Sequence, residues 1–201
     1  MKLWTIQPKA VYELIQRTGV YRCEAGKSEF LDESDPTSKP FYDAYGWMAA
    51  QMNKRIGERP CGVKYPVWAW YRYEGKEKPD IRKERWVNGH PGEEFACILL
   101  EVPDSEVLLS DYGLWHHVLN GWPITETEAE SIRADEFLEK KPYEERHRYL
   151  EKNWERVFKT GIQNNGWVRR GYDLQATFWE LKKEYVTGVK FFTCGRRKNY
   201  P

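Results

Sequence analysis

The feature that most constrains the fold is an unbroken apolar run, FACILL, at residues 95–100. A continuous run of this length fits a strand that is covered on both faces and so lies inside a sheet. Pro103 and Asp104 then supply a turn. A second short apolar run follows at 107–109. The sequence therefore predicts an interior strand at 95–100.

A helix is expected directly after the second run. Ser110 and Asp111 are both residues that cap helix N-termini, and Asn120-Gly121 provides the stop. The apolar residues between them recur at helical spacing: Leu114, Trp115, Val118 and Leu119. We expect this face to pack on the sheet, with Trp115 buried.

The remaining elements follow from turn residues and from apolar spacing. We expect strands at 3–7, 20–23, 66–73, 174–181 and 185–193, the last two forming a closing pair. Helices are expected from Pro8 to Gly19, from Pro40 to Gly57 and from Pro142 to Gly161, with a weaker one within 125–141. Residues 25–39 are polar and predict a surface loop. The predicted fold is α+β: one domain over residues 1–201, with a mixed, largely antiparallel sheet and helices packed outside it.

Composition narrows the class of protein. The net charge is +1, from 32 basic and 31 acidic residues, which argues against a dedicated duplex-DNA binder. Residues 1–7 have no apolar signal region, and no run approaches the ~20 apolar residues that span a membrane. The four cysteines are scattered singly, so zinc-ligand spacing is absent and no metal is expected. We expect reduced thiols in a cytoplasmic protein without a membrane partner.

The sequence also lacks several catalytic motifs. It contains no GxxxxGK[ST], GxGxxG, GxSxG or HExxH. His116 and His117 are the candidates for acid–base work, but adjacent histidines point about 100° apart on a helix and do not easily ligate one metal. Both flank the apolar helix face, so at least one is expected to reach solvent or a cleft. His116 is either a boundary residue or a general acid–base.

Strand alternation groups a second set of candidates. Gln175, Thr177 and Trp179 share one face of the strand expected at 174–181, and Glu180 falls on the other. Gln and Thr can orient a ribose or an amide by hydrogen bonds, and Trp supplies a stacking plane. The alternative is a half-exposed sheet face without a ligand.

A third set lies on the strand expected at 66–73. Trp68, Trp70 and Arg72 alternate onto one face. They form either a stacking platform for a nucleobase or single-stranded nucleic acid, or core tryptophans with an arginine that reaches out to solvent.

Seven motifs together resemble a bacterial family of unknown function, DUF3841, over nearly the whole chain. They are LWTIQ, AYGWM, PVWAW, PDIR, LLSDYGLWHHVLN, NWERVF and QATFWEL. This resemblance implies no particular activity.

The chain also resembles, more weakly, the ADP-ribosyltransferase architecture. LWTIQ followed by a helix that ends at Gly19 is similar to its opening, and QATFWELKKEYVTGVKFF to its closing strands. The resemblance implies NAD as cofactor, with Glu180 stabilising the developing ribosyl cation. Under it, Gln175 and Thr177 would orient the ribose, and Thr5, Gln7 and Trp68 would line the nicotinamide side. The first strand lacks the usual His or Arg, and Glu180 is out of phase with Gln175.

The sequence leaves three function hypotheses open. The first is an intracellular ADP-ribosyltransferase-like enzyme, or a degenerate relative that binds NAD or another small nucleotide without transfer. The second is a non-catalytic nucleotide-binding or single-stranded nucleic-acid-binding module, which uses the aromatic sheet face and the basic residues at 196–198. The third, a protein-interaction factor, has no specific support. The sequence does not fix the oligomeric state.

Overall fold

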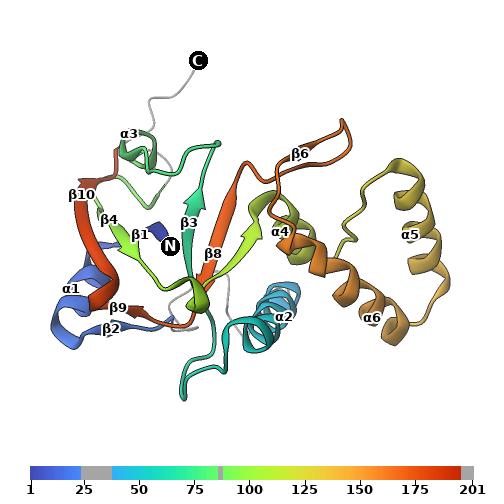
Figure 1. Ribbon diagram of the computed structural model, residues 1–201, viewed down its shortest axis with the longest axis horizontal. Helices are drawn as coiled ribbons and strands as arrows, with labels where there is room; N and C mark the ends of the chain where they lie inside the picture. Colours follow the sequence, from blue (N-terminus) through green and yellow to red (C-terminus); the bar gives the residue numbers. More distant parts are fainter. Residues whose placement is uncertain (24–37, 86–87, 196–201) are drawn as a thin grey trace.

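The largest sheet of the fold has six antiparallel strands and occupies the left half of the view in Figure 1. The computed structural model describes residues 1–23, 38–85 and 88–195. The spatial order of the strands is β10–β4–β1–β3–β8–β5. Their bounds are β1 (Lys2–Pro8), β3 (Val67–Arg72), β4 (Glu94–Glu101), β5 (Leu108–Asp111), β8 (Leu174–Phe178) and β10 (Val186–Thr193). The predicted α+β class with a largely antiparallel sheet is confirmed.

Helices and short elements complete the fold, and α5 and α6 lie to one side of the sheet (Figure 1). The α-helices are α1 (Lys9–Thr18), α2 (Lys39–Ile56), α3 (Ile81–Glu84), α4 (Tyr112–Leu119), α5 (Glu128–Lys140) and α6 (Tyr143–Trp154). The 3-10 helices are η3 (Asp104–Glu106), η4 (Glu155–Phe158) and η5 (Lys183–Tyr185). Two small ladders join β2 (Val20–Tyr21) to β9 (Leu181–Lys182) and β6 (Gln163–Asn164) to β7 (Arg169–Arg170). The expected loop at 25–39 lies almost wholly, and the basic residues 196–198 wholly, outside the described residues.

The two faces of the sheet are covered by different helices. On one face, Ile15 of α1 packs with Leu3 and Phe178, and we call this the α1 face. On the other, Trp68 and Leu108 pack with α2 and with Trp115 of α4, and we call this the α4 face. Helix α1 begins after Pro8 and ends at Gly19, whose φ of 86° is the left-handed conformation that glycine tolerates.

Strand β4 lies between β10 and β1, as the apolar run predicts. Its two faces are not equally buried. Ile98 and Leu100, on the α1 face, are 0% and 1% exposed. Leu99, on the α4 face, is only half-buried, and the apolar cluster that it joins has fewer buried members than the cluster on the α1 face. The interior position is confirmed, but only the α1 side of the strand is fully enclosed.

The expected closing pair of strands is not a pair. Strand β8 ends at Phe178, before Glu180, and pairs with β3 and β5. Strand β10 pairs with β4, so three strands separate the two. The residues between them form β9 and η5 instead of a tight turn, so the chain leaves the sheet before it returns at β10.

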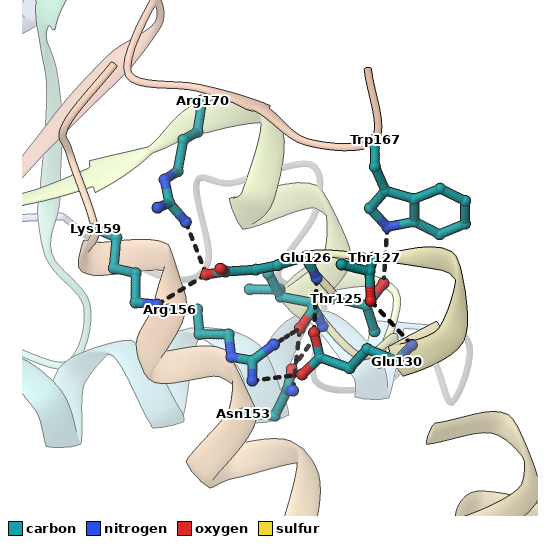
Figure 2. Close-up of polar contacts among 10 residues, drawn as sticks. Thr125, Glu126, Thr127, Glu130, Asn153, Arg156, Lys159, Trp167 and Arg170 are labelled. Carbon is teal, nitrogen blue, oxygen red and sulfur yellow. Dashed lines mark hydrogen bonds and ion pairs between the residues drawn. The ribbon is translucent and has the colours of Figure 1, made fainter. Parts of the chain in front are cut away.

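A network of ion pairs joins α5 and η4 to the rest of the fold (Figure 2). The Glu126 carboxylate accepts hydrogen bonds from Lys159 Nζ at 2.8 Å and from Arg170 Nη1 at 3.1 Å. The Glu126 backbone N–H donates to Glu130, whose other carboxylate oxygen lies 2.6 Å from Arg156 Nη2. Segments that are distant in sequence are thus tied together at the start of α5.

Glu126 should make the stability depend on pH in the acid range. Hydrogen bonds first from Lys159 and then from Arg170 lower the pKa of Glu126 to about 2. Because the folded-state pKa lies below the ordinary value of 4.5, the stabilisation is present above that value and is lost as the pH falls towards about 2. We expect Glu126→Gln to cost about 1 kcal/mol at pH 7, since the pair is partly exposed to solvent.

Urea unfolding of wild type and Glu126→Gln at pH 7, 4.5 and 3 measures this effect. The difference between the two proteins should shrink as the pH falls. Glu128→Gln is the matched control, because the described part of the chain gives the exposed Glu128 no ion pair. A wild-type-to-variant difference that stays constant over this pH range would contradict the assignment.

Candidate functional site

Four side chains form one row across the α4 face of the sheet. Trp4 of β1 pairs with Trp70 of β3, Trp70 with Gln175 of β8, and Gln175 with Ser110 of β5. Directly paired residues of an antiparallel ladder project to the same side, with Cβ atoms about 4.5–5.5 Å apart. The register therefore brings two indoles, an amide and a hydroxyl together.

Aromatic rings lead from this row to the surface. The Trp70 ring lies 4.7 Å from Tyr73 and 5.1 Å from Tyr112, and the Tyr112 ring lies 4.7 Å from His116. Trp70 and Tyr112 are half-buried, and His116 is exposed. We call Trp70, Tyr73, Tyr112, His116 and Gln175 the Trp70 patch.

Buried polar atoms under the patch lack protein partners. Within residues 1–23, 38–85 and 88–195, Gln175 Oε1 and Ser110 Oγ are buried without a hydrogen bond, and so are Nε1 of Trp4 and Trp68. Buried polar atoms are usually paired, and one left unpaired costs about 1–3 kcal/mol. A donor is missing for the amide oxygen, and acceptors are missing for the indole N–H groups.

Asp111 sets the position of α4 over this row. Its side chain accepts from the Leu114 N–H at 3.0 Å and from the Gly171 N–H at 2.6 Å. The Tyr112 N–H donates to the Asp173 carbonyl at 2.9 Å. Burial raises the pKa of Asp111, and the backbone N–H donors partly oppose this. These contacts fix where Tyr112 and His116 stand.

The PDIR segment borders the patch. Ile81 packs in the same apolar cluster as Trp70. Asp80 caps α3 by accepting from the Arg82 N–H at 3.2 Å. The Arg82 side chain is 93% exposed, and its Nε lies 3.3 Å from Asp80. An exposed guanidinium therefore stands on the element next to the aromatic rings.

The structure brings only some of the sequence-predicted residues together. Gln175 and His116 belong to the patch, and Trp68 lies one ladder step away from it. Thr177 is fully buried, and its hydroxyl donates to the Leu108 carbonyl at 3.2 Å. Trp179 is buried, and its indole donates to the Gly57 carbonyl at 3.1 Å. Thr177 and Trp179 are thus part of the packed interior and not of the patch. Strand β8 ends before Trp179.

Three predicted residues lie elsewhere. Register places Thr5 and Gln7 on the α1 face, opposite to Trp68 and Gln175, and Gln7 Nε2 donates to Thr5 Oγ1 at 2.9 Å. Glu180 follows the end of β8, and its carboxylate accepts from Arg22 Nε at 2.7 Å. It therefore lies outside the strand that carries Gln175. The common nicotinamide and ribose site that the transferase resemblance implies is not assembled.

The predicted platform of Trp68, Trp70 and Arg72 is also altered. A register shift between Trp70 and Arg72 breaks the alternation, so that Arg72 pairs with Leu174. The Trp68 ring lies 5.0 Å from Trp115 and 5.8 Å from Tyr45, beneath the helices. Burial raises the pKa of Tyr45 to about 12. Of the three predicted members, Trp70 is the one at the patch.

Sequence reasoning missed Ser110 and Tyr112 as site residues. Ser110 reads as a helix cap, but only Asp111 caps α4, while Ser110 belongs to β5 and is 0% exposed. Trp115 is buried, with an exposed fraction of 3%, and His116 is exposed, as expected. Tyr112 shares the helix face of His116 at a spacing of four residues, which was the available signal.

In the described ranges, no three His, Cys, Asp or Glu side chains gather closely enough to hold a metal ion. Nor is any described helix both long and apolar enough to span a bilayer.

Comparison with family models, curated proteins and solved structures places the chain. Neither the curated proteins nor the solved structures contain a significant match to this chain. A family model described as a domain of unknown function, DUF3841, matches residues 2–187. The chain therefore belongs to the DUF3841 family.

Proposed function

We propose that this protein binds a small nucleotide, with the base against Trp70 and hydrogen-bonded to Gln175. The observation that carries the proposal is the row of Trp70, Gln175 and Ser110, in which an indole adjoins two buried polar atoms that have no partner in the described chain. The row offers both an apolar surface and polar groups that need a ligand.

The chemistry of the row selects the ligand class. Gln175 Oε1 accepts a hydrogen bond, the Ser110 hydroxyl donates or accepts, and Trp4 Nε1 only donates. A nucleobase has a flat face for stacking and an edge that carries both donors and acceptors. The exposed guanidinium of Arg82 supplies a partner for a phosphate next to the base.

Binding without transfer fits the geometry better than catalysis. A transferase needs a carboxylate beside the ribose, whereas Glu180 is held by Arg22 beyond the end of β8. Thr5 and Gln7 project from the other face of the sheet. NAD remains a candidate ligand because it carries an adenine base and two phosphates.

Calorimetric titration with NAD, ADP-ribose and a short single-stranded RNA tests the proposal. Wild type should bind NAD and ADP-ribose. Gln175→Ala should weaken both several-fold, because one buried hydrogen bond is worth about 0.5–1.5 kcal/mol. Thermal stability should not fall, since Gln175 Oε1 has no partner to lose within the described residues. Gln163→Ala, on the separate β6–β7 ladder, is the matched control.

The other outcomes decide between the alternatives. Binding of RNA alone would favour a single-stranded nucleic-acid module. Release of nicotinamide from NAD that Glu180→Gln abolishes would restore the transferase hypothesis. If none of the three ligands binds, or if Gln175→Ala binds NAD as wild type does, the proposal is wrong.

A further inference from the structure

A cavity is lined by residues of α4, of the segment that follows it, of α5 and of the β6–β7 hairpin. Its volume is about 580 Å³, within the range of small-molecule sites. The side chains that matter below are Trp122, Trp167, Ser131, Asp135 and Arg169. We call it the Trp122–Trp167 pocket.

Two tryptophans in this pocket are open to solvent. Trp122 is 57% exposed and Trp167 is 47% exposed. Tryptophan is strongly buried on average, and its large apolar faces are costly to leave in water. Two such side chains come from separate segments of the chain and line one cavity. Exposed aromatic groups arranged in this way mark a ligand surface.

Trp167 is held in place by hydrogen bonds that leave the face of its ring free. The Trp167 indole N–H donates to Thr125 Oγ1 at 3.3 Å (Figure 2). Asn165 Oδ1 accepts from the Trp167 and Val168 N–H groups at 3.1 and 2.7 Å. Arg170, at the end of the same hairpin, is held by Glu126 at 3.1 Å.

The Trp122 wall is fixed in the same manner. Its backbone carbonyl accepts from the Trp154 indole at 2.8 Å. Asn153 Oδ1 accepts from the Ile124 N–H at 2.6 Å. The His117 ring lies edge-on to Trp122 at 6.1 Å, and its Nδ1 lies 3.0 Å from the Pro123 carbonyl. A site whose walls are held in place loses little entropy when a ligand binds.

The polar groups of the pocket carry both signs of charge. Ser131 and Asp135 are four residues apart on α5 and so share one face of it. Neither has a side-chain partner in the part of the chain that the structure describes. Arg169 is 3.8 Å from Asp173 and stacks at 4.2 Å on Tyr172. An acidic, a basic and a neutral side chain together give no preference for a charged ligand.

We propose that the Trp122–Trp167 pocket binds a neutral saccharide. The C–H faces of a sugar ring with equatorial hydroxyls are apolar and carry partial positive charge, which suits the negative face of an indole. The hydroxyls at the ring edge both donate and accept hydrogen bonds. They can therefore donate to Asp135, accept from Arg169 and do either with Ser131. A nucleotide fits less well because Asp135 opposes any attraction between its phosphate and Arg169.

Calorimetric titration with three trisaccharides, cellotriose, maltotriose and chitotriose, tests the proposal on the full chain. At least one should bind. Trp167→Ala and Trp122→Ala should each weaken that binding about tenfold, the upper range for one aromatic contact. Asp135→Asn should weaken it several-fold. Phe191→Ala removes an aromatic side chain that is 50% exposed on β10, outside the pocket, and is the matched control.

Tetramethylammonium and adenosine monophosphate complete the experiment. Binding of tetramethylammonium that requires Trp167, with no saccharide bound, would show a cation site and overturn the proposal. Adenosine monophosphate binding that requires Trp167 would equally overturn it, because the nucleotide would then occupy this pocket. Failure of all three trisaccharides to bind, or binding unchanged in Trp167→Ala, would also overturn it. None of these results depends on the Trp70 patch.

Discussion

Leu100→Ala should lower the free energy of unfolding by about 3–5 kcal/mol, because Leu100 is 1% exposed and lies on the enclosed side of β4. It pairs with Leu3 on one side and with Val186 on the other. A cavity there is bordered by strands on both sides and so cannot collapse easily.

Leu99→Ala is the matched control for this prediction. It makes the same chemical change one residue away, on the half-buried side of the strand. We expect a smaller loss, about 1–2 kcal/mol, since less apolar area leaves contact with the protein. Urea unfolding of the two variants gives both numbers. Equal losses would mean that the α1 face is not the better enclosed one.

Asp111→Ala is expected to cost about 2–4 kcal/mol. The substitution removes the cap of α4 and leaves the Leu114 and Gly171 N–H groups without their acceptor in a buried place. Asp111→Asn keeps one carbonyl oxygen and should cost less. Thermal or urea unfolding of both variants at pH 7 measures the losses.

The pH dependence gives an independent check on Asp111. Burial, the largest cause, raises the pKa of Asp111 above its ordinary value of 3.8. The folded state therefore binds this proton more tightly than the unfolded state does. Its contribution to stability is greatest below pH 3.8 and is lost as the pH rises through the higher folded-state pKa. As the pH falls through this window, the free energy of unfolding of wild type should rise relative to that of Asp111→Asn. A relative fall would contradict the assignment.

Much of the sheet could be predicted because its signals are local. The apolar run at 95–100 identifies an interior strand, and the prolines and glycines around α1 and α2 place those helices closely. The pairing of the strands could not be predicted from the sequence. The position of β10 beside β4 depends on the route that the chain takes through β9 and η5. Neither the spacing of apolar residues nor the turn residues predict that route.

The candidate site was only partly predictable for the same reason. Alternation correctly grouped Gln175 with Thr177, but it could not show that β8 stops at Phe178 and leaves Glu180 outside the strand. It could not show the register shift that moves Arg72 away from Trp70. The common row of Trp70, Gln175 and Ser110 comes from three distant segments and exists only once the register is known.

The indole N–H signals of the ten tryptophans test the central claim most directly. Each tryptophan gives one such signal in a ¹H–¹⁵N NMR spectrum, and substitution of single tryptophans assigns Trp68, Trp70, Trp122 and Trp167. Addition of ADP-ribose should shift the signals of Trp68 and Trp70 and leave those of Trp122 and Trp167 in place. Shifts confined to Trp122 and Trp167, or no shift at saturating ADP-ribose, would contradict nucleotide binding at the Trp70 patch.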